Sequence, residues 1–192
     1  GPYQERSVLI ARQIEHAENL DQMLNICMRL IDQFTPCDIA KACARLAELR
    51  VDNEGRWVRL TVDTEILFEE ILDKLAERTI NNAVEFDTDS ISTTACAFAT
   101  LSRHEEALFA VLAREAIAKI ENFNPETLSR TAWAFSNFRP PKQELYNAIR
   151  EKAVPRIREF NPKQLADMAW AFAWAGAEYE DFFSAVARAV IS

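Results

Sequence analysis

Residues that would face a helical core recur at steps of three and four near the C-terminal end of the chain. In one stretch they are Leu128, Thr131, Ala132, Phe135 and Phe138. The same spacing returns 37 residues later, in Leu165, Met168, Ala169, Phe172 and Ala175. Each stretch predicts an amphipathic helix, and the fixed offset between them predicts a structural repeat.

The repeat is also visible in the residue types. The stretch FNPETLSRTAWAF begins at Phe123, and FNPKQLADMAWAF begins at Phe160. Weaker copies are FDTDSISTTACAFATL from Phe86 and FTPCDIAKACARLAEL from Phe34. The first interval is 15 residues longer than the others. The sequence therefore predicts four units, 34–85 with an insertion over 50–65, 86–122, 123–159, and 160–192 with a truncated second helix.

Each unit reads as two helices. Asn124 and Asn161 can cap a helix start, and each is followed by a proline at the first helical position. Asp87 and Thr35 take the same place in the other two units. A single helical hairpin cannot bury both of its apolar faces, whereas stacked hairpins can. We therefore predict an all-α fold, a right-handed α-solenoid of stacked helical hairpins with a 37-residue repeat.

The remaining segments are less regular. In residues 1–33 we expect a further pair of N-terminal helices, or a degenerate unit. The last helical pattern stops at Ser192, four residues short of its counterpart in the preceding unit, so we expect the chain to be part of a longer array. In the insertion, Trp57, Val58, Leu60 and Val62 suggest an extended excursion or small hairpin that meets a partner. An ordinary long loop is the equal alternative.

Composition limits the function. The chain has 192 residues with only 3 glycines, which favours helices over β-hairpins. Its net charge is −8, distributed unevenly: residues 1–85 carry −6 and residues 123–159 carry +3. A protein that holds nucleic acid by bulk electrostatics is normally basic, so this balance argues against strong unaided binding. No apolar run is long enough to span a membrane.

Catalytic signatures are missing from the sequence. It has no glycine-rich phosphate loop, no nucleophile elbow and no zinc-binding histidine pair, and His104 is predicted to lie on the surface. The cysteines Cys27, Cys37, Cys43 and Cys96 follow helical patterns and are predicted to be buried free thiols rather than disulfides or metal ligands. We expect a non-enzyme without cofactor, metal or small-molecule substrate.

The motif F-x-P-x-x-L-x-x-x-A-W-A-F, repeated every 37 residues, resembles the heptatricopeptide and octotricopeptide helical repeats of organelle proteins. Proteins with these repeats resemble relatives of the RAP and FAST-kinase-like proteins. The resemblance covers about residues 34–192 and is strongest in the last two units. It implies binding of single-stranded mitochondrial or plastid RNA, in RNA stability, processing, translation or ribosome assembly. No targeting peptide is visible, and Gly1-Pro2 looks like a protease-cleavage scar.

Side chains on the first helices, opposite the core stripe, are the candidates for recognition. They occupy the fourth, eighth, eleventh and fifteenth positions of each unit. The candidate RNA- or partner-binding residues are Lys41, Thr93, Thr100, Arg130, Asn137, Lys163, Asp167 and Trp174. Arg130 and Asn137 are favoured because they lie in the basic unit and can donate to bases or phosphates. A solvated surface would show the same variation between units.

Two further groups of residues each allow two interpretations. Trp133 and Trp170 occupy equivalent places and can stack on bases, although packing between units accounts for them better. Trp174 is a better candidate for a partner contact. The basic residues that could follow a phosphate backbone are Arg139, Lys142, Arg150, Lys152, Arg156 and Arg158. A solvated outer face balanced by Glu151 and Glu159 is the alternative.

Two functions follow from these observations. The first is a non-catalytic repeat segment that binds single-stranded organelle RNA. The second is a protein-interaction scaffold, such as a structural subunit of an organelle ribosome or another assembly, without direct RNA contact. The first predicts a continuous basic groove on the side of the first helices, and the second predicts an acidic or apolar groove there.

Overall fold

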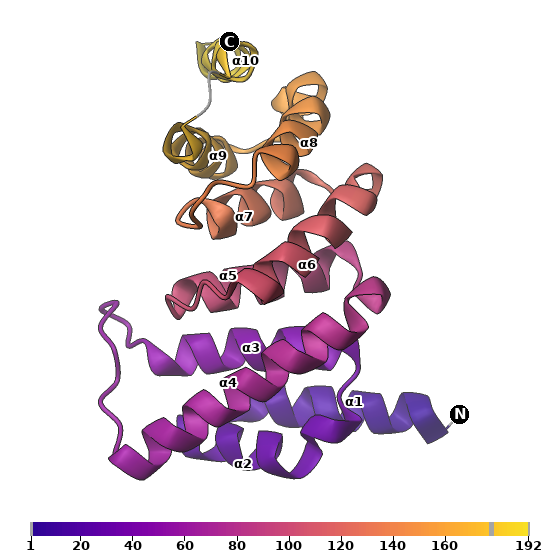
Figure 1. The fold of residues 1–192 in the computed structure, drawn as a ribbon, viewed down its shortest axis with the longest axis vertical. Helices are drawn as coiled ribbons and strands as arrows, with labels where there is room; N and C mark the ends of the chain where they lie inside the picture. Colours follow the sequence, from indigo (N-terminus) through magenta and orange to yellow (C-terminus); the bar gives the residue numbers. More distant parts are fainter. Residues whose placement is uncertain (1, 177–178, 192) are drawn as a thin grey trace.

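The computed structural model describes residues 2–176 and 179–191, and these residues form an all-α protein (Figure 1). The α-helices of these residues are α1 (Pro2–His16), α2 (Leu20–Leu30), α3 (Pro36–Arg50), α4 (Val62–Asn82), α5 (Thr88–Thr100), α6 (Glu106–Ala118), α7 (Pro125–Phe135), α8 (Gln143–Ala153), α9 (Pro162–Ala175) and α10 (Glu180–Ile191). Extended pairing within the described residues is limited to one bridge between Val51 and Trp57. None of the described helices combines the length and apolar character needed to cross a bilayer.

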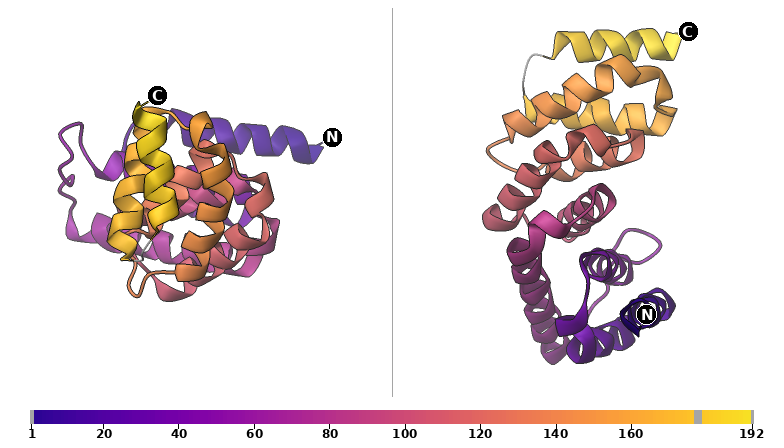
Figure 2. Two further views of the ribbon diagram at one scale, coloured as in Figure 1. Left: turned by 90° about the horizontal axis from the view of Figure 1, so that it is seen from above. Right: turned by 90° about the vertical axis from the view of Figure 1, so that its right-hand side faces the viewer.

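Consecutive helices pack in pairs, from α1 with α2 to α9 with α10. The first members of the pairs also contact one another in chain order, as α1, α3, α5, α7 and α9, and we call them the first-helix layer. The second members, α2, α4, α6, α8 and α10, form the second-helix layer. The pairs follow one another along a curved path, with the N-terminal pair at one end and the C-terminal pair at the other (Figures 1 and 2). The helix pair predicted for residues 1–33 is thus confirmed as α1 and α2.

The predicted caps begin the first helices. The Asn124 side chain accepts a 2.9 Å hydrogen bond from the N–H of Thr127, whose hydroxyl accepts in return from the Asn124 N–H. Asn161 and Gln164 form the same reciprocal pair in the next unit. Thr35 and Asp38 form such a reciprocal pair at the start of α3, and the Asp87 side chain accepts from the Ser90 N–H at the start of α5. These contacts satisfy N–H groups that have no partner inside a helix, so each unit has a defined starting point.

A 3₁₀ turn lies directly before each phenylalanine that opens one of the four units. The turns are Ile31–Gln33, Ala83–Glu85, Ile120–Asn122 and Val154–Glu159. Each following phenylalanine donates its N–H to the carbonyl three residues earlier, as Phe123 does to Ile120 at 3.1 Å. The rings of Phe34, Phe86, Phe123 and Phe160 are buried. The second helices α2, α4, α6 and α8 thus end in a 3₁₀ turn before the next unit begins.

Small side chains bring the first helices close together. Ala95 and Ala97 of α5 and Ala132 and Ala134 of α7 are all buried, and the two helices are in contact along their length. The predicted core positions are confirmed at Leu128, Thr131, Ala132, Phe135 and Phe138, and at Leu165, Met168, Phe172 and Ala175, whereas Ala169 is only half-buried. Helix α7 ends at Phe135 rather than near Phe138 as the spacing suggested. The Phe138 ring instead reaches the core from the following loop and stacks on Phe109 at 5.3 Å.

The first unit is longer than the others because it contains a tight turn and a longer second helix. The turn closes through the Val51–Trp57 bridge and has Gly55 at φ +76°. The last four residues of the predicted insertion belong to the first turn of α4, which spans 21 residues. The Arg50 side chain, only 8% exposed, holds the turn against α4 through an ion pair with Glu65.

Candidate functional site

Arg130 on α7 is partly exposed and links α7 to α5 within the first-helix layer. Its Nη2 donates a 2.8 Å hydrogen bond to the hydroxyl of Thr93 on α5. Its Nη1 lies 3.4 Å from an oxygen of Asp89, one turn earlier on α5. The structure thus brings Arg130 and Thr93 together, from the same position of two successive units. We call the surface made by the fourth, eighth, eleventh and fifteenth positions of the units the first-helix face.

A pocket of about 340 Å³ opens on the first-helix face. Its lining residues are Cys96, Arg130, Trp133, Lys163 and Asp167, from α5, α7 and α9. The Lys163 ammonium and the Asp167 carboxylate are 2.7 Å apart, and the indole of Trp133 is half-buried against the core. The lining thus combines a guanidinium, an ammonium, a carboxylate and an aromatic ring. Such groups can recognise a planar polar molecule without any covalent chemistry.

Cys96 contributes a thiol to the floor of this pocket. Its Sγ donates to the main-chain carbonyl of Arg130 at 3.3 Å. Burial raises the pKa of Cys96 to about 11, although the nearby Arg130 charge acts in the opposite direction. The thiol therefore stays protonated at neutral pH and links α5 to α7, rather than serving as a nucleophile.

The other candidates of the first-helix face lie toward its margins. Lys41 on α3 is ion-paired with Glu15 on α1 at 2.8 Å, and this hydrogen bond raises the pKa of Lys41. Thr100 at the C-terminal end of α5 and Asn137 in the turn after α7 are exposed and do not line the pocket. The structure therefore joins Thr93, Arg130, Lys163 and Asp167 in one place.

Trp174 forms a separate aromatic group on α9. Its ring centre lies 5.7 Å from that of Trp170, and both rings are about half exposed. The guanidinium of Arg139 lies 5.7 Å from the Trp174 ring centre and donates to the Trp174 carbonyl at 3.3 Å. Arg139, predicted as a phosphate contact, is therefore already engaged by an aromatic ring and a carbonyl.

Most of the other basic candidates are engaged by neighbouring carboxylates. Their partners are Glu106 for Lys142 at 2.7 Å, Asp181 for Arg150 at 3.8 Å, Glu121 for Lys152, and Glu159 for Arg156 at 2.9 Å. Arg158 is exposed and forms no ion pair with any residue in the described part of the chain. Lys142, Arg150 and Lys152 thus connect neighbouring units, whereas Arg156 pairs within its own unit, and the sequence reasoning had assigned neither role.

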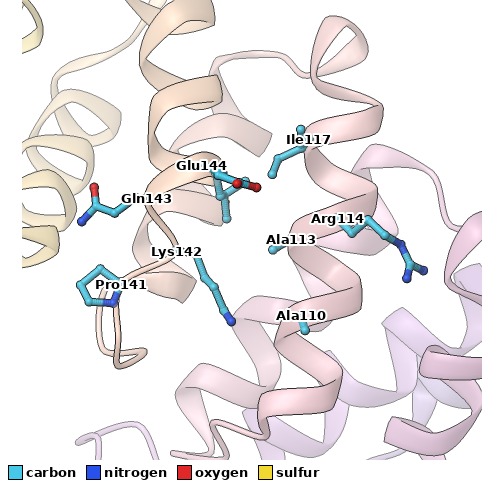
Figure 3. A pocket seen from close by; sticks show the side chains of 9 residues that line it. Ala110, Ala113, Arg114, Ile117, Pro141, Lys142, Gln143 and Glu144 are labelled. Carbon is cyan, nitrogen blue, oxygen red and sulfur yellow. The ribbon is translucent and has the colours of Figure 1, made fainter.

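A second groove, of about 480 Å³, lies between α6 and α8 in the second-helix layer (Figure 3). Its floor is formed by Ala110, Ala113 and Ile117, because the alanines leave space between the two helices. Lys142 extends across the groove toward α6, whereas Arg114 points away from it (Figure 3). The groove thus has an apolar floor and a charged rim.

The cysteines and histidines only partly match their predictions. Cys27 and Cys43 are buried, and burial raises the pKa of Cys27 to about 12. Cys37 is exposed, because it lies in the first turn of α3 on the side away from the core. His104 is half-buried against Phe109, with ring centres 5.7 Å apart, rather than on the open surface. Within residues 2–176 and 179–191, no cluster of His, Cys, Asp and Glu could hold a metal ion.

The fold and the site define an all-helical protein of paired helices with a polar, aromatic-lined pocket on one layer. Comparison of the sequence with protein-family models, and a search of curated proteins, gave no match.

Proposed function

We propose that this chain is a segment of a right-handed α-solenoid that binds single-stranded RNA along the first-helix face. The order of helix contacts supports the architectural part of the proposal, because each pair packs on the pair before it. Hydrogen bonds between units also span about one repeat. The Arg130–Thr93 bond joins residues 37 apart, and the bond from Cys96 to the Arg130 carbonyl joins residues 34 apart.

The pocket lined by Arg130 and Trp133 is the single observation that carries the RNA proposal. An indole can stack on any nucleobase, and such stacking contributes about 1–3 kcal/mol per base. A guanidinium has five N–H donors, and Thr93 and Asp89 engage only part of them. The Lys163 ammonium, whose side chain is 84% exposed, can reach a phosphate. Together these groups can bind a base and its backbone.

A protein-interaction scaffold is the second candidate, and a specific observation favours it. The cations of residues 123–159 are mostly engaged by the protein's own carboxylates, and the net charge of the chain is −8. A long phosphate backbone would have to compete with those carboxylates. Under this alternative, the first-helix face binds a segment of another protein without contacting RNA.

Fluorescence anisotropy with pooled, labelled single-stranded RNA distinguishes the two candidates. We expect binding at about 50 mM salt that weakens steeply as salt increases, because phosphate contacts release counterions. Arg130→Ala should weaken binding by about tenfold, in line with the loss of one good base or phosphate contact. Arg114→Ala is the matched control, because its exposed guanidinium lies in the second-helix layer. Absence of binding at low salt, or equal losses in both variants, would reject the RNA proposal and leave the scaffold.

The proposed role includes no catalytic step. The proposal that the protein acts in a mitochondrion or plastid depends only on the resemblance of the repeated motif to the helical repeats of organelle proteins. Imaging of the tagged full-length protein in its native cell, beside an organelle marker, tests that part. Uniform cytosolic signal would contradict it.

A further inference from the structure

The pocket on the first-helix face is lined by opposite charges from two successive units. Arg130 is the eighth residue of the unit 123–159, and Asp167 is the eighth residue of the next unit, 37 residues later. Both side chains line the pocket of about 340 Å³. Arg130 pairs with Asp89 on α5, whereas Asp167 pairs with Lys163 on its own helix. The two opposite charges thus have separate partners and still line the same cavity.

The Asp167 carboxylate retains capacity to accept hydrogen bonds. Its Oδ2 accepts from the Lys163 ammonium at 2.7 Å. A carboxylate has a second oxygen and further lone pairs on both oxygens. The Asp167 side chain is 35% exposed and that of Lys163 is 84% exposed, and ion pairs of this kind on a helix surface add little stability. A ligand can therefore engage this carboxylate with little loss of folding free energy.

The charges of the pocket converge on the Cys96 thiol. Burial is the main cause that raises the pKa of Cys96, and Asp167 raises it further. The charges of Arg130 and Lys163 lower the same pKa. The half-buried indole of Trp133 lines the cavity beside these groups. A molecule bound in the pocket therefore meets two cations, a carboxylate and an aromatic ring within one small volume.

Guanine is the nucleobase whose polar edges match this combination. Its Watson–Crick edge presents two adjacent donors, N1–H and the N2 amino group, which the two oxygens of a carboxylate can accept. Its O6 and N7 accept from a guanidinium or an ammonium. Adenine and cytosine present one amino group beside an acceptor nitrogen, and uracil presents one N–H between two carbonyl oxygens. A carboxylate repels such acceptors, so these bases match the pocket only in part.

We propose that this pocket selects guanine in single-stranded RNA, with Asp167 accepting from N1–H and the N2 amino group, and Arg130 or Lys163 donating to O6. This inference rests on the proposed RNA-binding function and adds the base that the pocket prefers. Trp133 stacks on the ring of the bound base. The negative charge of Asp167 opposes binding of phosphate, so its favourable contribution to RNA binding has to come from contact with a base.

Fluorescence anisotropy with labelled uridine-rich RNAs that differ at a single central base tests the proposal. That base is guanine, adenine, cytosine, uracil or hypoxanthine, which is guanine without its N2 amino group. We expect the guanine RNA to bind about tenfold more tightly than each of the others, as a good bidentate contact to one base allows. Asp167→Asn should reduce the affinity for the guanine RNA to that of the others, because an amide replaces one acceptor oxygen with a donor.

Glu48→Gln provides the matched control. Glu48 is an exposed acid of the first-helix face on α3, pairs with Arg45 on its own helix at 3.0 Å, and lies outside the pocket lining. This variant should keep the preference for guanine. The helical circular dichroism of both variants should match that of the wild type, because neither surface ion pair adds much stability.

The outcomes separate this inference from the RNA-binding proposal. Equal binding of all the RNAs by the wild type, or a preference for another base, would overturn the choice of guanine and leave RNA binding intact. A preference that survives Asp167→Asn would also overturn it. So would tighter binding of every RNA by both variants with unchanged ratios between bases, since that is the effect of removing one negative charge. Absence of binding to any of the RNAs would reject both proposals.

Discussion

The guanidinium of Arg156 donates a 3.0 Å hydrogen bond to the main-chain carbonyl of Phe123, the residue that opens its own unit. Lys119 does the same to Phe86 at 2.7 Å, and Arg78 to Phe34 at 2.9 Å. Each phenylalanine carbonyl precedes the cap of a first helix and cannot enter that helix's own hydrogen bonding. A cation near the end of the second helix therefore closes each of these three units onto its beginning.

Removal of this closing contact should destabilise the fold. We expect Arg156→Ala to lower the free energy of unfolding by about 1–2 kcal/mol, since a part-buried carbonyl loses a charged donor. Arg158→Ala is the control, because that side chain is exposed two residues away and should change stability by less than about 0.5 kcal/mol. Urea unfolding followed by circular dichroism measures both. Equal losses would mean that the contact with Phe123 contributes nothing.

Tyr146 provides a second test inside the core. Its hydroxyl donates a 2.8 Å hydrogen bond to the Ala132 carbonyl, and its ring packs on Phe172. Tyr146→Phe keeps the ring and removes the hydroxyl, so we expect a loss of about 1–2 kcal/mol in unfolding free energy. Tyr146→Leu also removes the aromatic contact and should cost more. Thermal melts of both variants check this order, and a Phe variant as stable as the wild type would contradict it.

The cysteines should differ in reactivity toward a disulfide reagent. Cys37 is exposed and should react first, whereas Cys27 and Cys43 are buried. Desolvation also raises the pKa of Cys37, so its thiolate fraction at a given pH is below that of a free thiol and its rate should keep rising above the usual thiol pKa. Absorbance of the released thiol gives the time course. A fast phase that survives in Cys37→Ser would show that another cysteine is accessible.

The turn of the first unit should depend on Arg50. Its guanidinium pairs with Glu65 at 2.6 Å and lies about 5 Å from the ring centres of Trp57 and Phe68. We expect Arg50→Ala to free the turn and accelerate proteolysis near Gly55 severalfold, because the nearly buried Arg50 side chain also donates to the Val58 carbonyl of this segment. Arg56→Ala changes an exposed arginine of the same turn and serves as the control. Limited proteolysis with mass mapping gives the result, and unchanged cleavage in Arg50→Ala would contradict it.

The regular elements were predictable because they depend on neighbours in the sequence. Asn124 and Asn161 revealed the helix starts through their capping chemistry, and Leu128 and Phe135 revealed the core face through spacing. The end of α7 was less predictable, since Phe138 keeps the apolar spacing but reaches the core from a loop. Periodicity alone cannot separate these two ways of burying a ring.

The tertiary roles of charged residues were not predictable. Arg156, a candidate phosphate contact, donates in the structure to the Glu159 carboxylate and to the main-chain carbonyl of Phe123. Every residue carries such a carbonyl, and no sequence pattern marks the one that is used. Lys142 and Lys152 likewise pair with glutamates about one unit earlier. Arg130, Lys163 and Asp167 had been grouped as candidates on the face of the first helices, whereas the pocket that they line with Trp133 and Cys96 was not predicted.

The order of helix contacts bears on how this protein folds. The polar contacts described between helix pairs join residues about one unit apart, such as Lys142 with Glu106, 36 residues away. No contact between distant ends of the chain has to form before the structure gains stability, so the entropy lost in closing loops stays small. A helix pair can therefore fold against its neighbour in a local step, and damage at one pair can leave the pairs beyond it intact.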